Sequence, residues 1–174
     1  MRGKRETSRG IPVAVVAAVL ALLLVLPGCA AMGRPPSPRG YADLWVIEPL
    51  TGLRGFASFQ ANPFSNELGD GLSQPLLDAI DAEIARTLKS KGLARPDGRT
   101  VSVTGQVIHI DQGPFQKAIV ARVAFREIAS GKLLCIVNVT GRVEGNRPVG
   151  DAVPALADGI ARFILQQQSG RGVR

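Results

Sequence analysis

The chain has 174 residues, with 21 Lys and Arg against 14 Asp and Glu, and a net charge of +7. Without residues 1–28, which hold four basic residues and one acidic residue, 146 residues and a net charge of +4 remain. That length suits one domain with its own hydrophobic core. One histidine and two cysteines argue against a zinc site or a disulfide framework. The absence of a basic stripe interleaved with aromatic residues argues against nucleic-acid binding.

The first 28 residues have the parts of an export signal. A basic head, residues 1–10, precedes a run from Ile11 to Leu26 that has no charged residue. Sixteen helical residues span only about 24 Å, less than the roughly 30 Å of a bilayer's hydrocarbon core. We therefore interpret residues 1–28 as a cleaved signal peptide, with an uncleaved membrane anchor as the alternative.

The end of this run, Leu26-Pro27-Gly28-Cys29, resembles the lipobox of bacterial lipoprotein signal peptides. That pattern has Leu three residues before the cysteine and a small residue directly before it. A thiol is nucleophilic enough near neutral pH to take up a diacylglyceryl group. The resemblance implies that Cys29 becomes the first residue, carrying diacylglyceryl and acyl lipid, and that these chains anchor the protein stably. In the sorting pattern of such lipoproteins, an aspartate directly after the cysteine keeps the protein out of the outer membrane. This chain has Ala30 there, so the resemblance implies an outer-membrane protein whose domain faces the periplasm.

Residues 29–41 are rich in Pro and Gly and predict a semi-extended tether that separates the membrane from a domain at 42–168. The apolar run Leu44–Ile47 predicts the first strand of that domain.

Residues 51–69 show no periodicity and predict a long loop that carries Phe56, Phe59 and Phe64. Loops of this length are usually functional or disordered. Two interpretations stay open: the three phenylalanines pack back onto the core, or they form an apolar contact surface for a partner.

A helix is predicted from a cap at Ser73, with Pro75 in its first turn, to Lys91. Its buried stripe has helical spacing and consists of Leu76, Leu77, Ile80, Ile84 and Leu88.

Three strands joined by turns follow, and they predict an antiparallel meander. The first, Thr100–Ile110, changes its alternation after Gly105, which predicts a bulge there. The second covers Ile119–Arg126, with Arg122 and Arg126 on its polar side. Ser130-Gly131 predicts a tight turn into the third strand, Leu133–Val143. Cys135 shares the parity of the apolar positions, so we expect an inert core thiol.

A last amphipathic helix is predicted from Asp151, with Pro154 in its first turn, to Gln168, followed by a disordered tail at 169–174. The order is then β-α-β-β-β-α. It predicts an α+β two-layer sandwich: a four-stranded, mainly antiparallel sheet with two helices on one face and a polar opposite face.

No residue pattern predicts an enzyme. His109 and Asp111 could share a strand face, but no Gly-x-Ser-x-Gly motif or reactive cysteine accompanies them. We interpret His109 as a surface residue, and we expect neither a metal nor a cofactor apart from the lipid on Cys29.

The layout of residues 42–168 resembles a domain-of-unknown-function family of small proteobacterial envelope lipoproteins and, more distantly, the lipopolysaccharide-assembly lipoprotein. The resemblance implies a fold, not an activity. We expect a non-catalytic interaction and assembly module that docks on an envelope protein through a free sheet edge. A carrier of a lipid or small apolar ligand is the alternative.

Overall fold

The structure is a computed structural model that describes residues 40–48 and 52–170. The predicted signal and lipidation residues Leu26, Pro27, Gly28 and Cys29 lie outside the described residues, as do most of the predicted tether and the end of the predicted tail. The described helices and strands all belong to one compact unit, residues 38–174, which therefore contains its own core.

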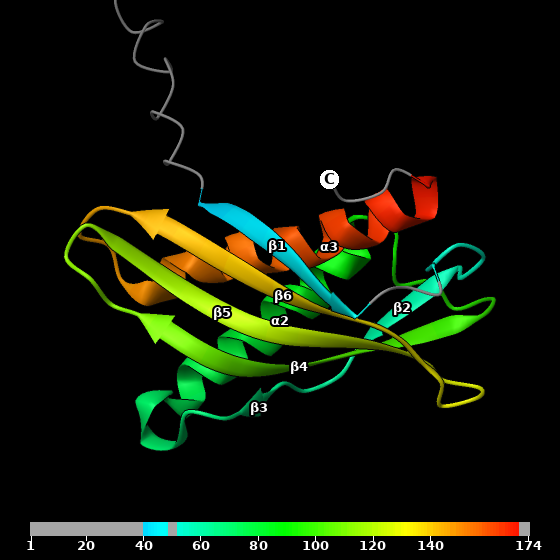
Figure 1. The fold of residues 1–174 in the computed structure, drawn as a ribbon, viewed down its shortest axis with the longest axis horizontal. Helices are drawn as coiled ribbons and strands as arrows, with labels where there is room; N and C mark the ends of the chain where they lie inside the picture. Colours follow the sequence, from blue (N-terminus) through cyan, green and yellow to red (C-terminus); the bar gives the residue numbers. More distant parts are fainter. Residues whose placement is uncertain (1–39, 49–51, 171–174) are drawn as a thin grey trace, which may run out of the picture. The chain divides into compact units, whose positions relative to one another are not determined.

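In the described part of the chain, six strands form one open sheet in the order β1-β6-β5-β4-β2, with β3 also paired to β4 (Figure 1). The neighbours among β1, β6, β5 and β4 are antiparallel, whereas β2 and β3 run parallel to β4. The bounds are β1 (Tyr41–Glu48), β2 (Ser58–Ala61), β3 (Ser65–Asn66), β4 (Thr100–Asp111), β5 (Gln116–Glu127) and β6 (Leu133–Glu144).

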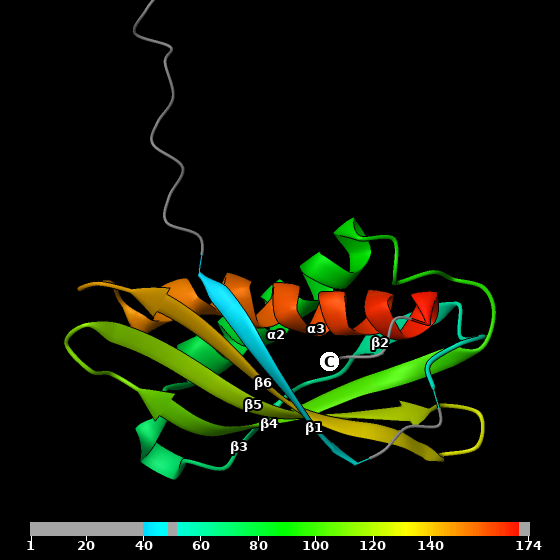
Figure 2. The same cartoon turned by 45° about the horizontal axis from the view of Figure 1, so that its top comes forward.

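Two long helices, α2 (Gln74–Ser90) and α3 (Val153–Ser169), contact each other and lie on one face of this sheet (Figures 1 and 2). A short 3-10 turn precedes each helix, η2 (Gly69–Gly71) and η3 (Val149–Ala152). Pro75 and Pro154 lie in the first helical turns, where a missing N–H removes no helical hydrogen bond. The fold is therefore a mixed α+β architecture with two helices, as the apolar spacing predicts.

The core lies between the sheet and the helices. Alternate residues of β4, β5 and β6 are fully buried there and meet the apolar stripes of α2 and α3. The rings of Phe125 on β5 and Phe163 on α3 lie 5.4 Å apart, within the range of favourable aromatic pairs.

The predicted count of four strands and the order β-α-β-β-β-α are wrong. Residues 51–69 are not a loop throughout, because they contribute β2 and β3 along the edge of β4. These strands have four and two residues, too few for a period of two to stand out in the sequence. Both strands form because they hydrogen-bond to β4, about forty residues further along the chain. The local sequence does not encode this pairing.

The predicted bulge at Gly105 is also wrong. The register of β4 against β5 shifts between Val107 and His109, so that Ile108 is the extra residue. Gly105 has another role: a Cβ on it would collide with the ring of Phe64, which packs against its backbone. The missing side chain at Gly105 therefore makes room for Phe64 in the core.

The segment around Phe64 is held by Asp81 of α2, whose Oδ1 accepts a hydrogen bond of 2.9 Å from the Phe64 N–H. Burial raises the pKa of the Asp81 carboxyl, and the bond from Phe64 opposes that shift. This contact connects α2 to the chain that leads into β3.

Helix α3 packs very close to the sheet, and glycines allow this approach. A Cβ on Gly141 of β6 would lie 2.6 Å from both the backbone oxygen of Ala152 and the backbone nitrogen of Leu156. A Cβ on Gly159 of α3 would lie 2.7 Å from the Cβ of Ala42 in β1. Backbone atoms cannot rotate away from a new Cβ as a side chain can. A side chain at Gly141 is therefore tolerated less well than one at Gly159.

The single cysteine among the described residues, Cys135 on β6, is 1% exposed and belongs to the core. Burial raises the pKa of its thiol to about 12, so the nucleophilic thiolate is scarce at neutral pH. The prediction of a buried Cys135 is confirmed.

We expect Gly141→Ala to lower the free energy of unfolding by about 1–3 kcal/mol, the usual cost of forcing extra atoms into a packed contact. Gly150→Ala is the matched control, because the nearest atom to its new Cβ would be the Leu76 Cδ1 at 4.0 Å. Urea unfolding followed by circular dichroism measures both variants. Equal stabilities for the two would show that α3 is not packed as closely as described.

We expect Cys135 to resist a thiol reagent such as 5,5′-dithiobis(2-nitrobenzoate) in the folded protein and to react promptly in denaturant. A form that begins at residue 38 has Cys135 as its single cysteine, so the absorbance at the end of the reaction counts this thiol alone. Prompt labelling in buffer would contradict the burial of Cys135.

Candidate functional site

The face of the sheet opposite the helices is the candidate functional site, and we call it the open face. Its residues alternate with the core residues of β4, β5 and β6 and are half-buried or exposed. One row crosses four strands: Trp45 on β1 pairs with Asn138 on β6, Asn138 with Arg122 on β5, and Arg122 with Gln106 on β4. An exposed indole, an amide, a guanidinium and a second amide thus lie side by side.

Asn138 has the most unusual position in this row. Its Oδ1 is buried and has no hydrogen-bond partner among the described residues. A buried acceptor without a partner costs free energy, so Asn138 is an unfavourable point within this row.

A hollow of about 340 Å³ lies on the open face beside this row. Its walls come from β4, β5, β6 and the chain around β3, and they include Ser65, Thr104, Gln106, Arg122, Ala124, Arg126 and Ile136. The Gln106 Nε2 donates a 3.0 Å hydrogen bond to the Glu67 Oε1 at the rim.

Two arginines give the hollow its charge. Arg122 and Arg126 are exposed, and neither has an ion-pair partner within residues 40–48 and 52–170. They stand four residues apart on β5 and on the same side of it, a separation of about 13 Å along the strand. Free guanidinium groups bind carboxylates and phosphates in bidentate geometry, so the hollow suits an acidic group.

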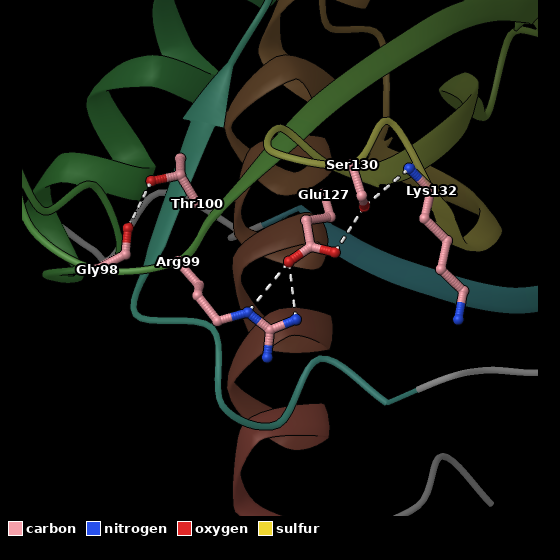
Figure 3. Close-up of polar contacts among 6 residues, drawn as sticks. All are labelled: Gly98, Arg99, Thr100, Glu127, Ser130 and Lys132. Atoms are coloured by element: carbon pink, nitrogen blue, oxygen red, sulfur yellow. Dashed lines mark hydrogen bonds and ion pairs between the residues drawn. The ribbon is translucent and has the colours of Figure 1, made fainter.

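A second polar cluster, centred on Glu127 at the end of β5, ties β5 to the turn that follows it and to the residue before β4 (Figure 3). Glu127 accepts hydrogen bonds from the Arg99 Nη2 at 2.8 Å and from the Ser130 Oγ at 2.7 Å. The bonds from Ser130 and Arg99 lower the pKa of the Glu127 carboxyl. Arg99 also lies 4.3 Å from the centre of the Phe56 ring, which ties the segment before β2 to this cluster.

His109 and Asp111 do not form a hydrogen-bonded pair in the structure. His109 is exposed near the end of β4, and the Asp111 Oδ1 accepts a 2.8 Å hydrogen bond from the Gly113 N–H in the following turn. The residues that the structure describes contain no group of three or more potential metal ligands.

The structure overturns the interpretation of Phe56, Phe59 and Phe64 as a contact surface. All three are buried, with exposed fractions of 6%, 0% and 4%, and they belong to the core. Since β2 and the chain before β3 lie along β4, these rings are packed in the core. The core cluster that they join lies between the sheet and the helices.

Sequence reasoning found the arginines of the open face but missed Trp45. Trp45 was assigned to an apolar strand because Leu44, Trp45, Val46 and Ile47 are all apolar, which hides which side faces the core. Arg122 and Arg126 were placed correctly on the polar side of their strand. The signal that could have found Trp45 is the longer alternation from Tyr41 to Ile47, in which Ala42, Leu44 and Val46 form the inner side.

No protein-family model matches this chain, and no curated protein matches it. Solved structures are similar in fold. A dodecamer of a PelC variant from Paraburkholderia phytofirmans has 10% identity and a TM-score of 0.51, covering 75% of this chain and 99% of that one. A second PelC dodecamer from the same organism has 12% identity and a TM-score of 0.49, covering 69% and 96%.

Lipoprotein GNA1162 from Neisseria meningitidis has 15% identity and a TM-score of 0.29, covering 63% of this chain and 99% of that one. The first PelC structure supports the α+β fold, and at these identities and scores the comparisons support nothing beyond it. No helix within the described residues is long and apolar enough to cross a membrane.

We expect the free energy of unfolding of Glu127→Gln to depend less on pH in the acid range than that of the wild type. The lowered pKa means that ionised Glu127 stabilises the fold above its unfolded pKa of about 4.5, and that this contribution is lost as the pH falls through the lower folded-state value. The wild type should therefore exceed the variant in stability at pH 7, and the difference should shrink below pH 4.5. Urea unfolding across this range checks it, and a constant difference would contradict the assignment.

Proposed function

We propose that this protein is a bacterial envelope lipoprotein, anchored by lipid on Cys29, whose folded domain is a non-catalytic docking module at the outer membrane. The observation that carries the docking role is the open face, where two arginines with no ion pair among the described residues lie beside a hollow of about 340 Å³. The sequence Leu26-Pro27-Gly28-Cys29, behind an uncharged apolar run, supports the anchor.

The chemistry of the hollow indicates an envelope protein that presents acidic side chains. Arg122 and Arg126 are spaced along one strand, which suits carboxylates on an extended segment laid across the sheet. Thr104, Gln106 and Asn138 around them offer neutral hydrogen-bonding groups, which favour a specific orientation over simple charge attraction.

Self-association, in which the partner is a second copy of this chain, is the alternative to docking on another envelope protein. The PelC structures similar in fold are dodecamers, and the present chain could assemble in the same way. Light scattering of the purified protein would identify such self-association, and the crosslinking experiment below separates it from docking on another protein.

The anchor is tested by the mass of the N-terminal peptide from protein purified out of bacterial membranes. We expect the peptide to begin at Cys29 and to carry diacylglyceryl and acyl groups. Cys29→Ser should accumulate with residues 1–28 attached, because no thiol is present to take up the lipid. A wild-type peptide that begins elsewhere, or without lipid, would refute the anchor.

The docking role is tested by crosslinking in living cells followed by mass spectrometry. The double variant Arg122→Glu with Arg126→Glu should lose the dominant crosslinked partner, because reversed charges repel acidic side chains. Lys89→Glu on α2 is the matched control and should keep it, since Lys89 is exposed on the helical side. Equal crosslinking in all three proteins would exclude the open face as the docking surface.

A further inference from the structure

Three large apolar side chains are exposed on the outward side of β1, and we call them the β1 patch. Tyr41, Trp45 and Ile47 are 42%, 74% and 42% exposed. They are separated by even numbers of residues along one strand, so they point to the same side of the sheet. Single exposed apolar residues are ordinary on protein surfaces, but neighbouring ones on an edge strand form a surface suited to a contact.

We propose that the β1 patch contacts the surface of the lipid bilayer in which the protein is anchored. The inference rests on the proposed lipidation of Cys29, which precedes Tyr41 by 12 residues in the sequence. A chain of that length spans at most about 40 Å even when fully extended. The start of β1 is therefore the described part of the domain that covalent geometry keeps nearest to the lipid.

The composition of the patch fits a bilayer surface better than it fits bulk water. Tryptophan and tyrosine are enriched at membrane–water interfaces, because each combines a large apolar ring with one polar group that stays hydrated. Ile47 adds an apolar side chain that can enter the outer part of the hydrocarbon.

The acidic residue within the patch is paired with a basic residue of the next strand. Asp43 lies between Tyr41 and Trp45 on the same side of β1, and its Oδ2 lies 2.9 Å from the Nε of Arg142 on β6. The ion pair neutralises the carboxylate, which would otherwise be repelled by anionic headgroups.

The position of β1 makes membrane contact compatible with docking. β1 forms one edge of the sheet, whereas the hollow lies toward the opposite edge, where β2 and β3 pair with β4 (Figure 1). Three strand spacings of about 4.8 Å separate β1 from β4. The β1 patch and the hollow share the open face, so a domain tilted to bring only the β1 side of that face to the membrane would hold the hollow away from it.

Trp45 is the only tryptophan in the sequence, so its fluorescence reports on the patch directly. The lipidated protein is reconstituted into vesicles of phosphatidylethanolamine and phosphatidylglycerol, with and without brominated phosphatidylcholine, which quenches tryptophan on contact. The matched control combines Trp45→Phe with Ala82→Trp, which moves the reporter to an exposed position of α2 on the helical side. We expect a roughly twofold greater loss of emission from Trp45 than from the control reporter, because only Trp45 should reach the interface.

Equal quenching of the two reporters would overturn the inference. It would also be overturned if Trp45 were shielded from both brominated lipid and aqueous iodide, because a second copy or another protein would then cover the patch. The mass of the N-terminal peptide from the same sample shows separately whether Cys29 carries lipid. Should it carry none, the proposed anchor fails, while brominated vesicles added to the unlipidated protein still test the contact of Trp45.

Discussion

The fold depends on how closely α3 approaches the sheet. Gly141 on β6 and Gly159 on α3 leave no room for a Cβ, so the helix lies directly against the backbone of β6 and against Ala42 of β1. This approach brings Phe163 against Phe125 and closes the core on the side of β1 and β6. Gly105 has the corresponding role on the other side, where it admits the ring of Phe64. Glycines, which have no side chain, therefore allow the close packing of both the last helix and the segment before β3.

Because both helices are committed to one face, the opposite face of the sheet remains uncovered by the other described elements (Figure 2). Antiparallel sheets tolerate this arrangement when their alternation places polar residues outward. Here the outward residues include two exposed arginines that have no ion pair within the part of the chain that the structure describes. Polar groups of this kind are what a docking surface offers to a partner that can satisfy them.

The two edges of the sheet differ in polarity, as do the two contacts proposed for them, with an acidic protein partner and with a membrane. The edge beyond β4 carries β2 and β3 and adjoins the polar hollow, whereas the edge at β1 carries an exposed indole and a short apolar row. Edge strands have unpaired backbone groups that can bind further strands, so proteins usually cover or protect them. A membrane surface beside β1 would protect that edge without requiring a protein partner.

The sequence by itself determined both long helices, the three-stranded meander, the burial of Cys135 and the outward position of Arg122 and Arg126. Each depends on a period of 3.6 or 2 that neighbouring residues display. Only the tertiary structure decided that Phe56, Phe59 and Phe64 are buried, that residues 51–69 add two strands to β4, and that Trp45 faces outward. These features arise from contacts between segments far apart in the chain, and in β1 both sides of the strand are apolar. The four residues Leu44–Ile47 alone do not distinguish the inner side of β1 from the outer side, whereas the position of α3 does, and the longer alternation from Tyr41 agrees with it.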